Sequence, residues 1–427
     1  MMSELTPAVP LAERVTQHHI GEMLLQTLPT PVRDVVAVRG SFRAHPDFGA
    51  DEDLVQTLCV KMLDKGTVQH DQFAIADVLE NRGAKVSFRT DGDRVVFHAK
   101  MLNSDVGVVL PLLAEQIHQP RFAEAEFQQV QAQVAAELQH AMQSTGAQAG
   151  AAFSKRLYSP AHPNYDPDPA AQLDHLAQIS LDDVRAFHVE HFGANELVVT
   201  AVGDLDEEAL VTLLAKGFGT WPLHKQPASF TPDAQPQPPG RSDVPIADKM
   251  NLDVLLGHAI RLRRQDPDYL ALYLANFILG GNFSSRLMGT IRDEQGLTYG
   301  INSGLSGIGI EHDADWRVKV TLSQANLEHG IEAVRAEVAR FLNDGVTQEE
   351  LDTAKTTVAG IFQVSQGTTG GLASLLHTNA ERQFDVAYLD RFTEEVHATT
   401  LDDMHAAMAR HLSLDSLQVA VAGTLPD

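Results

Sequence analysis

The 427-residue sequence has a single cysteine, Cys59, and therefore no internal disulfide. It also has no excess of positive charge, since 57 acidic residues face 32 basic ones and the formal net charge is -25. Such a chain repels phosphate backbones and anionic lipid heads, so we expect neither nucleic-acid binding nor membrane binding. No apolar run approaches the roughly 18 residues that cross a bilayer, and no secretory signal is visible at the start. These absences predict a cytoplasmic protein.

Several common signatures of catalysis are missing as well. The sequence contains no His-Glu-x-x-His, no Gly-x-Ser-x-Gly elbow, no Walker loop and no Gly-x-Gly-x-x-Gly fingerprint. Among 19 histidines, only His188 and His191 form a close pair on a predicted helix. At spacing i, i+3 they could bind a metal, but a solvated helix face is the favoured interpretation. Cys59 is interpreted as a small buried hydrophobe.

The length and the 44% apolar content predict more than one globular unit, because single cores stop growing at roughly 250 to 300 residues. Residues 221–246 are rich in proline and show no periodic apolar pattern. This stretch predicts a linker at residues 223–244. We therefore expect one domain at residues 1–222 and a second at residues 245–427.

The two predicted domains share an internal repeat. Residues 181–203, LDDVRAFHVEHFGANELVVTAVG, match residues 401–423, LDDMHAAMARHLSLDSLQVAVAG, at a constant offset of 220, and eight of the 23 pairs are identical. Each copy predicts a helix that begins at LDD, followed by a turn and an apolar strand that ends at glycine. The sequence therefore indicates a tandem duplication.

Apolar periodicity predicts the same kinds of element in both halves. Strands are predicted at residues 35–40, 86–90, 95–100, 253–260, 298–304 and 316–322. Helices are predicted at residues 106–117, 123–143, 327–343 and 348–366. Runs of strands followed by pairs of helices predict an α+β fold with two homologous domains, each a mostly antiparallel sheet packed with helices.

Two segments carry a resemblance to a known family. Residues 279–300 read LGGNFSSRLMGTIRDEQGLTYG, and residues 62–67 read MLDKGT. Together they resemble the substrate-holding segment and the segment after the zinc motif in the pitrilysin and mitochondrial-processing-peptidase superfamily. The resemblance covers residues 32–423, nearly the whole chain, and implies the same duplicated α+β architecture.

The resemblance also shows what this chain has lost. In the superfamily a His-x-x-Glu-His motif precedes the run that corresponds to residues 62–67, and those positions are here Thr57, Val60 and Lys61. The family's third ligand falls 76 residues after Lys61, at Glu137. We therefore expect no metal bound by this chain, and we hypothesise that the Lys61 ammonium occupies the metal position and pairs with Glu137. The alternative is that both side chains reach solvent.

The substrate-holding residues are retained. In heterodimeric members of the superfamily the subunit without zinc presents an Arg and a Tyr seven residues apart, which are here Arg292 and Tyr299. Both side chains donate hydrogen bonds to peptide carbonyls, which only accept them. Around them, Ser284 is expected to cap the helix that runs to Asp293, Gly296 to turn the chain, and Arg286 to tether the helix.

These features predict the non-metal subunit of a heterodimeric zinc endopeptidase. The resemblance implies a homologous partner that carries the zinc and the general-base Glu, with unfolded peptides as substrates; a homodimer is possible when the chain is isolated. An acidic chamber wall would favour basic peptides. The alternative is a catalytically inactive scaffold of the same fold, and an autonomous peptidase with a rearranged zinc site is disfavoured.

Overall fold

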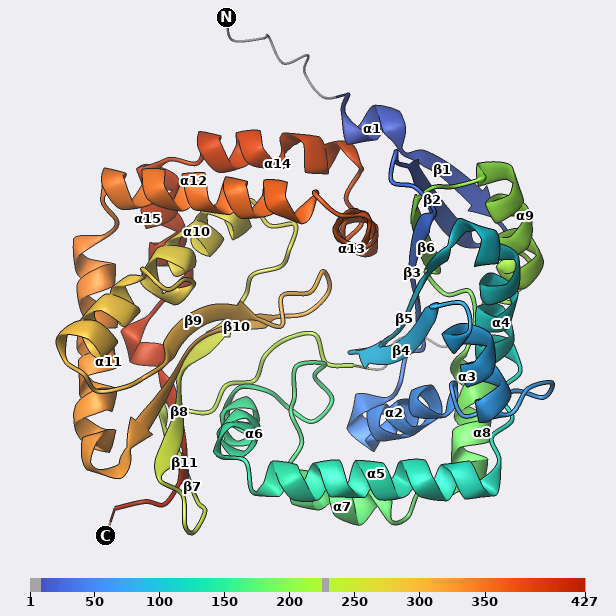
Figure 1. Cartoon of the computed structure of the whole chain (residues 1–427). Coiled ribbons are helices and arrows are strands. Elements are labelled where there is room, and N and C mark those ends of the chain that lie inside the picture. Colours follow the sequence, from blue (N-terminus) through green and yellow to red (C-terminus); the bar gives the residue numbers. More distant parts are fainter. Residues whose placement is uncertain (1–8, 225–229, 427) are drawn as a thin grey trace, which may run out of the picture.

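The computed structural model describes residues 9–224 and 230–426. They form two halves, each a sheet covered by helices, and the two halves stand opposite each other (Figure 1). The α+β prediction is confirmed, and the duplication is visible in the matching order of elements. Every predicted strand or helix bound lies within three residues of the observed one.

The first sheet has six strands in the order β1-β2-β6-β3-β5-β4. Their bounds are β1 Thr16–Ile20, β2 Met23–Pro29, β3 Val35–Arg43, β4 Lys85–Asp91, β5 Arg94–Leu102 and β6 Val198–Gly203. All neighbouring strands are antiparallel except β2 and β6. Strand β4 is one of the two edges, and its alternating exposure reflects a face that packs on the core and a face that does not.

The second sheet has five strands in the order β7-β11-β8-β10-β9. Their bounds are β7 Gly240–Pro245, β8 Asn251–Ile260, β9 Ile301–Ser306, β10 Ala314–Ser323 and β11 Gln418–Gly423. The two copies of the repeat end in β6 and β11, and each of these strands has one parallel and one antiparallel neighbour. The repeated strands thus occupy equivalent places in their sheets.

Helices cover both sheets. In the first half they are α1 Leu11–Arg14, α2 Glu52–Met62, α3 Gln72–Glu80, α4 Val106–His118, α5 Glu124–Met142, α6 Thr145–Leu157, α7 Pro169–Leu176, α8 Leu181–His191 and α9 Glu207–Phe218. In the second half they are α10 Tyr269–Gly280, α11 Leu327–Asp344, α12 Gln348–Ser365, α13 Thr369–Glu381, α14 Ala387–Ala398 and α15 Leu401–His411, together with a π-helix, η3 Met288–Glu294. Short 3-10 turns lie at η1 Phe48–Ala50, η2 Asn103–Asp105, η4 Gln324–Asn326 and η5 Leu414–Ser416. Within the described residues, none of these helices combines the length and apolarity needed to cross a membrane.

The helices that begin with Leu-Asp-Asp in the two repeats are capped by the residue before this sequence and not by an Asp within it. Ser180 and Thr400 are the N-caps of α8 and α15, and each forms a capping box with the acidic residue three positions later, Asp183 or Asp403. The hydroxyl accepts from one otherwise unpaired N–H and the carboxylate accepts from another. The last Asp of each LDD therefore closes the box, and the first acidic positions favour the helix through its dipole.

The two halves exchange a helix. Helix α6 of the first half packs on β8 and β11 of the second sheet through Ala149, Phe153 and Leu157. Helix α13 of the second half packs on β3 and β6 of the first sheet through Ala373 and Leu376. Figure 1 shows both helices on the inner sides of the sheets. Each half therefore completes the apolar packing of the other.

This arrangement changes the description of the predicted linker. Residues 240–245 form β7, an edge strand that pairs in parallel with β11, so the linker prediction was wrong for residues 240–244. Residues 225–229, which also fall in the predicted linker, lie outside the described residues. The proline-rich composition had indicated no regular structure. An edge strand tolerates such a sequence, because the backbone groups along its outer side form no hydrogen bonds to a neighbouring strand.

Candidate functional site

The former metal position lies where α2 packs against α5. Lys61 is in the last turn of α2, and its Nζ donates to Glu137 Oε1 on α5 over 3.1 Å. Gln133 donates to the same oxygen over 2.9 Å. Partial burial raises the pKa of Glu137, but the bonds from Gln133 and Lys61 outweigh it and hold that pKa below its usual value. The hypothesis that Lys61 pairs with Glu137 is confirmed.

The other two positions do not fit a divalent cation. The Thr57 hydroxyl donates to the backbone oxygen of Asp53 over 2.9 Å, and Val60 is 3% exposed within the apolar core. Zinc sites need imidazole, thiolate or carboxylate ligands, and an ammonium group repels a cation. Among residues 9–224 and 230–426, no cluster of three or more His, Cys, Asp or Glu side chains could hold a metal. The geometry offers zinc one carboxylate, and that carboxylate is already paired.

Arg292 and Tyr299 lie around an exposed phenylalanine. The Arg292 guanidinium carbon is 4.7 Å from the centre of the Phe283 ring, and Phe283 is 73% exposed. Tyr299 is 96% exposed and lines a groove of about 470 Å³ together with Phe283. The nearest carboxylate of Arg292 is Asp293, at 3.9 Å, so its donors are weakly engaged. We call Phe283, Arg292 and Tyr299 the aromatic-arginine cluster.

The groove reaches the inner face of the second sheet. Its lining includes Asn302 on β9 and Lys319 and Thr321 on β10. These residues alternate with the core residues Val318 and Val320, so they point to the side on which α6 packs. The aromatic-arginine cluster therefore sits at the end of the sheet face that looks toward the first half.

The turns that hold the cluster differ from the prediction in detail. Tyr299 precedes β9 rather than lying in it, and the observed strand begins at Ile301. The prediction that Ser284 caps the helix was wrong, because within the described residues its hydroxyl accepts no backbone N–H, while its own N–H donates to the Asn282 side chain over 2.8 Å. Gly296 adopts a φ of 63°, so it turns the chain as expected in a conformation that favours glycine.

Arg286 is the structural anchor of this region, as predicted. Its guanidinium makes two bonds to Glu350, of 2.6 and 2.7 Å, and one of 2.8 Å to the Gly345 oxygen. Burial alone would raise the pKa of Glu350, but Arg286 and Thr347 bond to the carboxylate and lower that pKa to about 2. A bidentate pair of this kind fixes the helix that bears Arg292 to the start of α12.

The histidine pair of α8 was interpreted wrongly as a solvated face. His191 is 4% exposed and its Nδ1 is 2.7 Å from the Ala44 oxygen, while His188 Nε2 is 2.8 Å from the Ile117 oxygen. Both rings bond backbone carbonyls and pack on aromatic side chains. They hold α8 against β3 and α4, so their role is structural.

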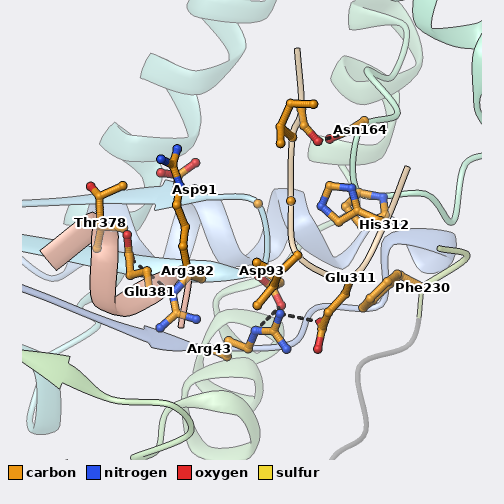
Figure 2. Close-up of a pocket in the computed structure, with 18 of the residues that line it drawn as sticks. Arg43, Asp91, Asp93, Asn164, Phe230, Glu311, His312, Thr378, Glu381 and Arg382 are labelled. Atoms are coloured by element: carbon orange, nitrogen blue, oxygen red, sulfur yellow. Dashed lines mark hydrogen bonds and ion pairs between the residues drawn. The ribbon is translucent and has the colours of Figure 1, made fainter. Parts of the chain in front are cut away.

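A cavity of about 640 Å³ lies between the two halves, and we call it the chamber (Figure 2). Its walls come from β3, β4 and β5, from the segment between β9 and β10, and from the end of α13. Arg43 of β3 links the halves, since its guanidinium lies 2.6 Å from Glu311 and 3.1 Å from Asp93. The buried ring of His162 lies beside His312 of this wall, with ring centres 5.5 Å apart.

The sequence prediction missed the chamber residues, among them Arg39, Arg89 and Arg94. One signal could have found them. The segments KVSFRTD and RVVFHAKML place basic or polar residues at alternate positions, which a strand presents on a single face. The sequence prediction treated these segments only as strands, with no attention to the charge of that face.

Comparison with known proteins places the chain in one family. The family description "Peptidase M16 inactive domain" matches residues 178–358, and "Insulinase (Peptidase family M16)" matches residues 55–161. The chain is similar to the "Non-peptidase homolog YmxG" of Helicobacter pylori, with 21% identity over 85% of this chain and 83% of that protein. It is also similar to the "Uncharacterized zinc protease SCO5738" of Streptomyces coelicolor, with 23% identity over 96% and 92%.

Solved structures show the same fold along the whole chain. An M16 inactive domain from Pseudomonas fluorescens superposes with a TM-score of 0.86 and 25% identity, over 96% of this chain and 98% of that chain. The periplasmic protease PqqL of Escherichia coli gives a TM-score of 0.80 at 15% identity, over 97% of this chain and 46% of that chain. Since one of these relatives is periplasmic, the cytoplasmic location stays a prediction.

Proposed function

Because this chain belongs to the M16 peptidase family and is an inactive, non-peptidase-like homologue within it, we propose that it is the non-metal subunit of a two-chain zinc endopeptidase. A homologous partner with an intact His-x-x-Glu-His motif would carry out the cleavage. This chain would hold an unfolded peptide so that the partner's active site can reach it. The unsuitable side chains at Thr57, Val60 and Lys61 support a division of labour in which the metal belongs to the partner.

The observation that carries this proposal is the exposure of the aromatic-arginine cluster. Tyr299 leaves 96% of its surface in water beside Phe283, which is 73% exposed, and an exposed aromatic patch of this kind marks a site of interaction. Tyrosine and arginine are also the residue types most enriched where proteins bind partners. Arg292 stacks on Phe283 and keeps its donors largely unpaired, which leaves them for an incoming carbonyl.

The chemistry of the pair suits peptide cleavage. The Tyr299 O–H and the Arg292 N–H groups both donate, and a scissile carbonyl gains negative charge as it is attacked. A donor aimed at that developing charge contributes about 3 kcal/mol, or about a hundredfold in rate. Because the cluster adjoins the groove on the inner face of the second sheet, a peptide in the groove would pass both donors.

The experiment is reconstitution. The full chain is mixed with a purified M16 homologue that carries the intact zinc motif, and hydrolysis of a fluorogenic peptide is measured for each protein alone and for the mixture. We expect cleavage only in the mixture. Arg292→Ala and Tyr299→Phe should each lower kcat about a hundredfold, with the fold unchanged by circular dichroism, because both side chains contribute little to packing.

A matched control is Arg391→Ala. Arg391 is half exposed and lies on α14, where its ion pairs with Asp385 and Glu395 are both 3.6 Å long. This variant should leave cleavage unchanged. If the mixture forms and Arg292→Ala cleaves as fast as the unmodified chain, the scaffold alternative replaces the proposal. Zinc-dependent cleavage by the isolated chain would contradict both.

A further inference from the structure

The inner face of the first sheet is basic near its free edge. Strand register places Lys85 of β4 opposite Lys100 of β5, and Ser87 of β4 and Arg39 of β3 on either side of His98. Cross-strand partners point to the same side of a sheet, and Arg89 lies on that side too. We call Lys85, Arg89, His98, Lys100 and Arg39 the basic face. In a chain with a net charge of -25, four Lys and Arg side chains around His98, against the single acidic residue Asp91 of β4, are a local reversal of charge.

Most of these cations lack a carboxylate partner. Within residues 9–224 and 230–426, Arg39, Lys85 and Lys100 form no ion pair, and Arg89 is paired only with Asp91 of its own strand, at 2.9 Å. The acidic side chains of the chamber are already engaged. Arg43 lies 3.1 Å from Asp93, and Arg94 lies 3.4 Å from Glu381. Each described carboxylate that lines the chamber is therefore already paired with an arginine.

The pKa shifts agree with this crowding of positive charge. Burial, and then the charges of Arg39, Lys85 and Lys100, lower the pKa of His98. Burial and then Arg89 lower the pKa of Arg39, against a smaller opposing effect of Glu381. Like charges directly opposite each other destabilise a sheet. Arg39, Arg89 and Arg94 also line the chamber, so the basic face opens onto the space that a substrate would enter.

From this juxtaposition we infer that the chamber binds acidic peptides in extended form, added to the edge of β4 alongside the basic face. The inference rests on the proposed function, since it names the class of peptide that the non-metal subunit accepts. An acidic wall would have favoured basic peptides, but the sequence alone did not place the charges of the chamber. The charge of the whole chain is acidic, but the wall of the chamber is not.

The free edge of β4 favours a peptide over other polyanions. In the described residues β4 pairs only with β5, so its outer N–H and C=O groups can pair with an added strand. Nucleic acid offers no such backbone pattern, and the net charge of -25 repels it at longer range. A strand added to β4 would place alternate side chains about 5 Å from Lys85 and Arg89.

The experiment measures binding to the full chain without any partner subunit. Two fluorescein-labelled decapeptides are compared by fluorescence anisotropy, one of alternating Thr and Glu and the other of alternating Thr and Lys. We expect the acidic peptide to bind about tenfold more tightly at about 50 mM salt. The ratio should fall toward one at about 1 M salt, where the screening length is about 3 Å.

Two variants locate the effect. Lys85→Gln and Arg89→Gln, alone and together, should weaken the acidic peptide by about threefold each and leave the basic peptide unchanged. Both side chains are exposed, so folding should be preserved. The matched control is Lys216→Gln, an exposed lysine on α9, a helix whose buried residues pack on the opposite face of the first sheet.

Three outcomes would overturn the inference: equal affinity for both peptides, tighter binding of the basic peptide, or a loss in Lys216→Gln as large as that in Lys85→Gln. Equal affinity would leave the basic face the role of protecting an exposed sheet edge against aggregation. These results are independent of reconstitution. The inference can fail while Arg292 and Tyr299 still support cleavage, and the absence of cleavage would leave the peptide affinities interpretable.

Discussion

The inner faces of the two sheets are built alike but charged differently. In the second sheet two acidic side chains on this face, Asp315 and Asp253, are bonded to neighbouring side chains. Arg317 makes bonds of 2.5 and 2.6 Å to Asp315, and Asp253 accepts from Thr145 of α6 and from Thr321. In the first sheet Arg39, Lys85 and Lys100 have no carboxylate partner in the described chain.

The difference follows from what each exchanged helix covers. Helix α6 brings Tyr158, just after its end, into a 2.9 Å bond with Asp315, so it adds polar partners as well as apolar packing. Helix α13 contacts β3 and β6, and the edge strand β4 extends past it. The two sheets therefore have equivalent folds but different proposed roles. In our proposal the inner face of the first sheet binds an acidic peptide, and the inner face of the second sheet is bonded to α6 and to the residue that follows it.

The largest effect is expected when the contacts of the two exchanged helices are removed one at a time, which tests whether both helices stabilise the protein equally. Phe153→Ala in α6 and Leu376→Ala in α13 both truncate side chains that are fully buried between the halves. We expect each to lower the free energy of unfolding by about 3 to 4 kcal/mol, measured by urea denaturation. Val364→Ala, at a position that is 78% exposed on α12, is the control and should change it by less than about 0.5 kcal/mol. A large loss in only one variant would show that the exchange is not symmetric.

A second test uses acid, because two carboxylates of the second half, Glu381 on α13 and Glu350 on α12, have strongly lowered pKa values. Burial raises the pKa of Glu381, but the effects of His377, Ser41 and Arg94 are larger and lower this pKa to about 2. In the same way, burial raises the pKa of Glu350, and Arg286 lowers it to about 2. A depressed folded-state pKa stabilises the fold above the ordinary value of about 4.3 and loses that stabilisation as pH falls toward 2. Each carboxylate should contribute at most about 3 kcal/mol, and solvent screening reduces this for the more exposed Glu350.

Thermal unfolding at pH 7 and pH 3 measures this contribution. Glu381→Gln and Glu350→Gln should both lower Tm at pH 7 and should both lose less stability on acidification than the unmodified chain. Glu349→Gln, an exposed neighbour of Glu350, is the control. If the acid sensitivity of Glu381→Gln matched that of the unmodified chain, the Arg94 contact would not hold α13 to the first sheet.

The smallest effect is expected at the former metal position. Lys61 and Glu137 are 32% and 50% exposed, so their pairing is screened by water. Lys61→Met should change the free energy of unfolding by less than about 1 kcal/mol, and a double-mutant cycle with Glu137→Gln isolates the pair. A coupling energy above about 2 kcal/mol would mean that the pair stabilises the α2–α5 contact as a buried ion pair does.

The sequence predicted local features well. Hydrophobic periodicity located most strands of both sheets, although not β1, β2 and β7, because it reports which side of each element is buried. The ligand spacing implied by the family resemblance located the pairing of Lys61 with Glu137, and Arg286 was identified as an anchor. The same reasoning was wrong about His188 and His191, because a helical position on an amphipathic face does not reveal which carbonyl oxygen lies opposite it.

By itself, the sequence indicated the duplicated α+β plan through the repeat at an offset of 220 residues, and the family resemblance placed Thr57, Val60 and Lys61 where the zinc motif would stand. The tertiary structure alone decided that α6 and α13 cover each other's sheets and that β7 closes an edge. It also decided that the inner face of the first sheet is basic near the edge strand β4. These properties depend on contacts between residues that are often more than 100 positions apart, such as Arg43 with Glu311. An apolar or charged pattern in the sequence indicates that one face of an element will pack against another element. Which element that is depends on the tertiary structure.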